Sequence, residues 1–128
     1  MLSKKILKKI PIIKRVYPSL MKIFYKNKKI KFKFFGLNLE GNFSEPMDKE
    51  IFLFNNYENS QIEFLINNIK KYNLKYFIDI GANSGIYSLI IRDKFHKIRI
   101  KSFEPVKKTI DKFKDNLKFN KKLKNIKL

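Results

Sequence analysis

The fold is decided by the stretch Phe77-Ile78-Asp79-Ile80-Gly81-Ala82-Asn83-Ser84-Gly85. An apolar run leads into a loop bounded by two glycines, and a helical pattern follows to about Lys94. A second apolar run over residues 98–103 ends in Phe103-Glu104-Pro105. This succession of strand, glycine loop, helix and strand is typical of an open parallel α/β sheet with a Rossmann-like arrangement.

The loop sequence indicates which ligand such a sheet would hold. The dinucleotide fingerprint is Gly-x-Gly-x-x-Gly, and its second glycine lets a pyrophosphate approach the backbone. Here the position two after Gly81 is Asn83, and the chain has no Gly-Lys-Ser/Thr phosphate loop. S-adenosylmethionine carries an adenosine but no phosphate, so the loop favours S-adenosylmethionine as the cofactor and methyl transfer as the reaction.

The predicted cofactor site lies at the carboxyl ends of the two strands. A loop of Gly81, Ala82, Asn83 and Gly85 would pass under the cofactor, with positive φ angles at its glycines. Asp79 would accept hydrogen bonds from the loop or, through water, from the cofactor's ammonium group, or would only cap the loop. Glu104 would accept both ribose hydroxyls, or would be an exposed carboxylate before Pro105.

Two other residues have open assignments. Tyr87 would close one wall of the cofactor pocket or pack on the sheet. His96 precedes the second strand, about 20 Å from the carboxyl ends at ~3.3 Å per residue, so we expect it on a surface loop. No catalytic residue is assigned. Because the chain has no cysteine and one histidine, we predict no metal site.

The chain of 128 residues divides into three segments by pattern. Residues 1–28 are a basic, helical segment, in which Leu2, Ile6, Ile10 and Ile13 recur at near-helical spacing. Residues 29–56 alternate as a β-hairpin turning at Gly36 and continue as a helix from Pro46. Residues 57–128 contain a further helix and the α/β unit, and residues 125–128 resemble the start of a third strand.

The net charge of +19 is concentrated at the amino-terminal end. The first 39 residues contain twelve Lys and Arg and no acid. A leader helix that caps the domain is one interpretation, and a helix lying on an anionic membrane is another. Abundant Lys, Ile and Asn with little Arg indicates compositional bias rather than nucleic-acid binding. The expected location is cytoplasmic, either free or peripheral at the inner face of the membrane.

The sequence stops at the start of the third strand, so it supplies only one side of the crevice in which such a sheet would bind its ligand. A doubly wound sheet binds its ligand beside the first strand, where the strand order reverses. We therefore expect the chain to be the N-terminal part of a longer protein, a class I methyltransferase fold truncated after the start of its third strand. The 128-residue chain alone is expected to bind the cofactor weakly and to have no methyltransferase activity.

Residues 57–128 resemble the FkbM-type S-adenosylmethionine-dependent methyltransferases. The resemblance rests on Phe77-Ile-Asp-Ile-Gly-Ala-Asn-Ser-Gly-Ile-Tyr-Ser88, on Phe103-Glu-Pro105, on Asp115-Asn-Leu-Lys-Phe-Asn120 and on the Tyr57-Glu58 pair. It implies methyl transfer to a hydroxyl oxygen of a sugar, polyketide or similar small molecule. It also implies that Asn83 orients the loop or reaches the methionine part, although Asn83 could equally cap the helix. Glu58 would line the acceptor pocket or stabilise the helix beside it.

Two other functions stay open on the sequence. The charge would suit a module that binds or modifies nucleic acid, against which stand the low arginine content and the lack of a recognised motif. The second alternative is a non-catalytic fragment that keeps the Rossmann-like fold but has lost the methyl-transfer chemistry. The oligomeric state, the general base and the methyl acceptor are not indicated by the sequence.

Overall fold

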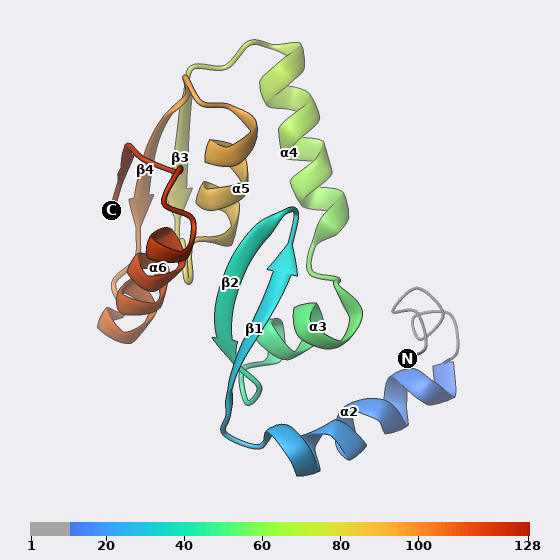
Figure 1. Ribbon diagram of the computed structural model, residues 1–128. Coiled ribbons are helices and arrows are strands. Elements are labelled where there is room, and N and C mark those ends of the chain that lie inside the picture. Colours follow the sequence, from blue (N-terminus) through green and yellow to red (C-terminus); the bar gives the residue numbers. More distant parts are fainter. Residues whose placement is uncertain (1–10) are drawn as a thin grey trace. The chain divides into compact units, whose positions relative to one another are not determined.

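The computed structural model describes residues 11–128, which fold into two compact units, 11–57 and Glu58–Leu128. Both units combine helices with a small sheet, so the protein is of the mixed α/β class (Figure 1). None of the described helices is long and apolar enough to cross a membrane. Three residues of the predicted amino-terminal stripe, Leu2, Ile6 and Ile10, lie outside the described residues.

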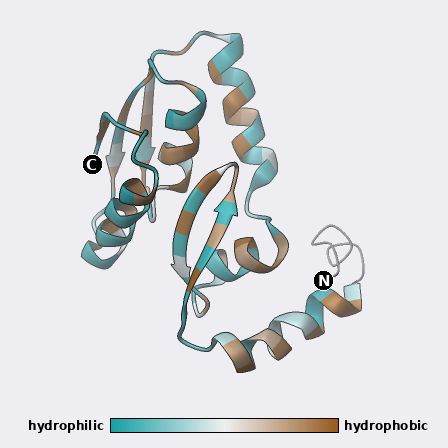
Figure 2. Ribbon diagram, viewed as in Figure 1, coloured by the Kyte–Doolittle hydropathy of each residue, from teal (hydrophilic) through white to brown (hydrophobic). Residues whose placement is uncertain are grey.

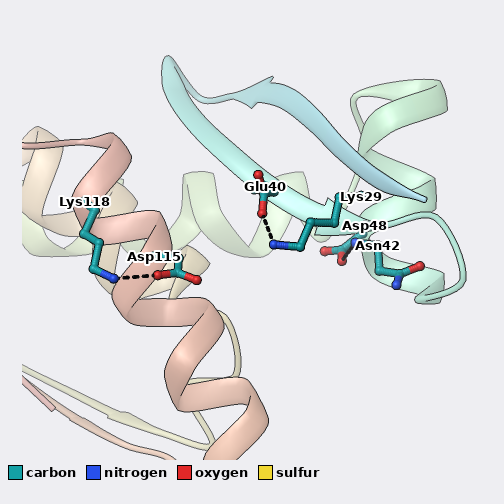
Figure 3. Close-up of polar contacts among 6 residues, drawn as sticks. All are labelled: Lys29, Glu40, Asn42, Asp48, Asp115 and Lys118. Carbon is teal, nitrogen blue, oxygen red and sulfur yellow. Dashed lines mark hydrogen bonds and ion pairs between the residues drawn. The ribbon is translucent and has the colours of Figure 1, made fainter. Parts of the chain in front are cut away.

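The first unit contains the predicted β-hairpin. Strand β1 (Lys29–Phe34) pairs antiparallel with β2 (Leu37–Asn42), and the turn uses positive φ angles at Phe35 and Gly36. Side chains along β1 alternate between exposed lysines and buried Ile30, Phe32 and Phe34, as a strand with one covered face requires. Lys29 and Glu40 form a diagonal cross-strand ion pair of 2.9 Å (Figure 3).

Two helices complete this unit, α2 (Pro11–Tyr25) and α3 (Pro46–Phe54). The N–H of Asn42 donates to the carboxylate of Asp48 over 2.7 Å, which joins the end of β2 to the first turn of α3 (Figure 3). Asp48 is buried, and its carboxylate occupies the space where a side chain on Gly41 would lie. The bare backbone of Gly41 therefore allows the close approach of α3 to the hairpin.

The second unit is the predicted α/β unit, preceded by α4 (Asn59–Lys71). Strand β3 (Tyr76–Ile80) is followed by α5 (Ile86–Lys94), and β4 (Arg99–Phe103) by α6 (Lys107–Phe119) and the short β5 (Ile126–Lys127). The three strands are parallel, in the order β3-β4-β5. The strand expected before Gly81, the helix expected to end near Lys94 and the strand expected over residues 98–103 are present within one or two residues, and β5 lies within the expected residues 125–128.

One face of this sheet carries the core. Ile69 of α4 and Ile91 of α5 pack with Ile98 and with Ile100 of β4, and Phe77 of β3 packs against the same cluster. The helices α4 and α5 lie beside the sheet in Figure 1, and they bring their apolar stripes to this one face. This packed core supports the strands from whose carboxyl ends the two loops extend.

The continuous apolar run over residues 76–80 is typical of a parallel strand buried on both faces, but that expectation is wrong. Tyr76, Ile78 and Ile80 are 64%, 60% and 83% exposed, while the alternate residues are half-buried. The physical reason is that the core helices pack on the opposite face. In addition, β3 has β4 on one side and no strand of the described residues on the other. The continuous apolar pattern correctly predicted a strand, but it did not indicate that one face of this strand would be left exposed.

Candidate functional site

The loop between β3 and α5 is tied to the neighbouring strand by its own backbone. The N–H groups of Gly81 and Ala82 both donate to the carbonyl of Phe103, over 2.9 and 3.0 Å, and the N–H of Gly85 donates to Ala82 over 2.8 Å. Gly81 and Gly85 have φ angles of +77° and +81°, a conformation that glycine adopts at little cost. The predicted positive φ angles are thus confirmed, and the loop is ordered by internal contacts.

The two glycines have different surroundings. At Gly81 no heavy atom would lie within 4 Å of an added Cβ, so the loop backbone is exposed to open space there. At Gly85 an added Cβ would lie 2.2 Å from two ring carbons of Phe113 in α6. Gly81 therefore leaves room for a ligand above the loop, whereas Gly85 allows α6 to pack against it.

Asp79 lies at the end of β3 in a short hydrogen-bond chain. The Ser88 hydroxyl of α5 donates to Asp79 Oδ2 over 2.6 Å, and the Ser88 and Ser102 hydroxyls are 2.8 Å apart. Both serines are buried. Burial raises the pKa of the Asp79 carboxyl above its ordinary value of 3.8, and hydrogen bonds from the Ser88 side chain and backbone partly oppose this rise.

This raised pKa predicts a pH dependence of stability. The folded unit binds the Asp79 proton more tightly than the unfolded chain, so ionisation lowers stability as pH rises from 3.8 through the raised pKa. Asp79→Asn cannot ionise. Its free energy of unfolding relative to the wild type should therefore rise over this window. Urea unfolding at a series of pH values measures it, and an equal trend for the control Asp111→Asn would contradict the assignment.

Glu104 and Asn83 meet at the same end of the sheet. Glu104 Oε2 accepts the N–H of Asn83 over 2.9 Å, and Oε1 accepts the N–H of Val106 over 2.9 Å. The carboxylate thus links the loop after β3 to the start of α6, and each oxygen keeps a lone pair for a further donor. The alternative role of Asn83 as a helix cap is wrong, because Gly85 occupies the N-cap position of α5 and no side chain caps that end.

Glu58 and Tyr87 form a pair that the sequence did not indicate. The Tyr87 hydroxyl in α5 donates to Glu58 Oε2 over 2.6 Å, and Glu58 occupies the N-cap position of α4 with a φ angle of +46°. A carboxylate at this end of a helix is favoured by the helix dipole. The pair joins a residue predicted for the acceptor pocket to one predicted for the cofactor pocket.

The structure adds residues that the sequence interpretation missed. Ile80 and Phe103 are register partners at the last positions of β3 and β4, and they are 83% and 54% exposed. They place an apolar surface directly beside the loop. Asn116, buried in α6, donates to the Ser84 carbonyl over 3.2 Å and so connects α6 to the loop. The one sequence signal for these two residues is their position, since Ile80 directly precedes the glycine loop and Phe103 directly precedes Glu104.

A hollow of about 770 Å³ lies elsewhere in this unit. Its lining includes Tyr76, Ile78, Arg99 and Lys101 along the strands, together with His96 in the loop before β4. His96 is exposed, as predicted for a surface loop. None of the loop residues from Gly81 to Gly85 lines this hollow. The predicted site at the carboxyl ends of β3 and β4 is therefore distinct from this hollow.

No family model, curated protein or solved structure matches this chain. The class that the described residues define is an α/β protein, with a three-stranded parallel sheet in one unit and an antiparallel hairpin in the other.

Proposed function

We propose that the Glu58–Leu128 unit binds S-adenosylmethionine as part of a Rossmann-like methyltransferase that acts on the hydroxyl oxygen of a small molecule. The observation that carries this proposal is the arrangement at one end of the sheet. A glycine loop with open space above Gly81 lies between two carboxylates, Asp79 and Glu104, from neighbouring parallel strands. The resemblance of residues 57–128 to the FkbM-type methyltransferases supports the same proposal.

The residues at this end fit the parts of such a cofactor. The remaining lone pairs of Glu104 suit two neighbouring ribose hydroxyls, and the exposed Ile80 and Phe103 suit the flat apolar face of an adenine. Asp79 is half-buried near the loop and suits a cationic amine, either directly or through water. Since most loop amides donate within the protein, side chains rather than these amides would give the site its selectivity.

When bound, S-adenosylmethionine would supply an electrophilic methyl group for transfer to an acceptor oxygen. The contribution of the chain to such a step is positioning, because a fixed attack geometry lowers the barrier without any covalent role for the protein. Glu104 and the glycine loop would hold the methyl donor at the carboxyl ends of β3 and β4. We assign no general base among the described residues.

Calorimetric titration of the full chain with S-adenosylmethionine tests the proposal. We expect binding that S-adenosylhomocysteine blocks and NAD does not, because the loop lacks the glycine that a pyrophosphate requires. Glu104→Gln should weaken binding about tenfold or more, since a charge-assisted acceptor is lost. The matched control Glu63→Gln, an exposed carboxylate on α4, should bind as the wild type does.

Thermal unfolding of each variant separates a lost contact from a lost fold. If the wild-type chain shows no heat of binding at about millimolar ligand, where the binding free energy is near −4 kcal/mol, the proposal is wrong. Equal affinities of the wild type and Glu104→Gln would remove Glu104 from the site.

A further inference from the structure

Helix α2 has two apolar faces, and the hairpin and α3 use only one of them. On the inner face, Tyr25 stacks near Phe43 and Phe52, with ring centroids 5.5 and 5.2 Å away, and Tyr17 lies 6.3 Å from Phe54. These aromatic contacts hold α2 against the rest of its unit. No side chain of α2 is fully buried, although the helix is strongly amphipathic by sequence.

The other face of α2 is an exposed apolar stripe. It recurs at intervals of three and four residues and covers an arc of about 120° at 100° per residue. Figure 2 shows hydrophobic bands along this helix. The exposed fractions are 75% for Ile12, 48% for Val16, 53% for Leu20, 76% for Ile23 and 65% for Phe24. Five large apolar side chains on one helix are more than the scattered exposure that a protein surface ordinarily shows.

Cations lie next to this stripe. At the same helical spacing, Arg15, Lys22 and Lys26 form a strip along one side of the apolar arc, and all three are exposed. A hollow of about 320 Å³ opens beside them, and its lining includes the lysines at positions 22, 26 and 49 and no acidic residue among those described. The first acidic residue of the chain is Glu40.

We infer that α2 docks the protein on an anionic lipid bilayer. The apolar stripe would enter the boundary between headgroups and acyl chains, and the adjacent cations would contact lipid phosphates. An apolar face bordered by cations, with no carboxylate on the helix, matches the charge of such a surface. A protein groove would have to be both apolar and acidic to match it equally well. Ile13, the described member of the stripe expected from the sequence, falls within the same arc and is half-buried.

Vesicle co-sedimentation of the full chain tests this inference, which does not depend on the proposed methyl transfer. We expect binding to vesicles of phosphatidylcholine with phosphatidylserine and little binding to phosphatidylcholine alone. Binding should fall between about 0.15 M and about 1 M salt, as the Debye length shrinks from ~8 to ~3 Å. Failure to bind the anionic vesicles, or equal binding to both kinds, would overturn the inference.

Two variants separate the stripe from the charges. The double variant Ile12→Ser with Ile23→Ser removes apolar area at two exposed positions. It should lower the partition coefficient onto anionic vesicles about tenfold or more. Arg15→Gln with Lys22→Gln should lower it about fivefold for each charge removed. The matched control is Phe64→Ser, an apolar side chain 66% exposed on α4, which should leave binding unchanged. An equal loss for this control would show non-specific adhesion and would overturn the inference.

Discussion

Gly85→Ala is expected to lower the free energy of unfolding of the Glu58–Leu128 unit by about 2–5 kcal/mol. Two costs add at this position. The φ angle of +81° disfavours any residue with a Cβ, by roughly 1–2 kcal/mol. The new methyl group would also overlap the Phe113 ring, whose nearest carbons are 2.2 Å away and which is completely buried, and such overpacking costs roughly 1–3 kcal/mol.

Gly81→Ala is the matched control for this prediction. It lies in the same loop with a φ angle of +77°, but no atom would meet its Cβ within 4 Å. Urea unfolding of the full chain, followed by circular dichroism, should show a loss of only about 1–2 kcal/mol for Gly81→Ala. Equal losses at both glycines would mean that the approach of Phe113 does not matter.

A double variant checks the mechanism of the Gly85→Ala effect. Phe113→Ala removes the ring that the new methyl group would meet, at its own cost of about 3–5 kcal/mol. If the overlap is the cause, adding Gly85→Ala to Phe113→Ala should cost less than adding it to the wild type. Strict additivity of the two changes would contradict the packing explanation.

Arg92→Met is expected to lower the free energy of unfolding of the same unit by about 2–4 kcal/mol. Arg92 is 4% exposed at the end of α5, where its guanidinium donates to the carbonyls of His96 and Asn125, each over 2.7 Å. Burial lowers the pKa of this guanidinium, which nevertheless stays charged near neutral pH. Losing two charge-assisted hydrogen bonds outweighs the relief of removing a buried charge, because both carbonyls lose their donors.

Two other variants make the Arg92 prediction specific. Arg92→Lys keeps the charge, but an ammonium on a flexible stem cannot reproduce the planar fork between two carbonyls, so it should recover less than half of the loss. Arg99→Met, at an exposed position, should cost less than about 1 kcal/mol. Hydrogen exchange should report faster opening at Ile126 and Lys127 in Arg92→Met, since Asn125 leads into β5. Unchanged exchange there would contradict the proposed role.

Much of the second unit could be predicted from local patterns. The alternation of apolar runs with the glycine loop predicted β3, the end of α5 and β4 to within one or two residues. The acid at each strand end indicated that Asp79 and Glu104 would share one end of a parallel sheet, and the register of Ile80 with Phe103 agrees with this. These features depend on strand direction and periodicity, which neighbouring residues determine.

The partners within the site could not be predicted in the same way. Glu58 with Tyr87 and Ser88 with Asp79 are joined across different elements, and Glu104 caps the loop amide of Asn83 rather than standing free. Each pair depends on how helices are rotated and seated on the sheet. A hydrophobic period indicates which face of a helix is covered, but it does not specify which polar group lies opposite.

The amino-acid sequence by itself determined the order of the elements, the parallel direction of the strands and the two glycines that take positive φ angles. Local sterics and side-chain periodicity are enough for these. Tertiary structure decided that Gly85 meets Phe113, that Arg92 binds the Asn125 carbonyl, and that Tyr76, Ile78 and Ile80 remain uncovered. These depend on contacts between residues far apart in the chain, and only the packed fold specifies which surfaces meet.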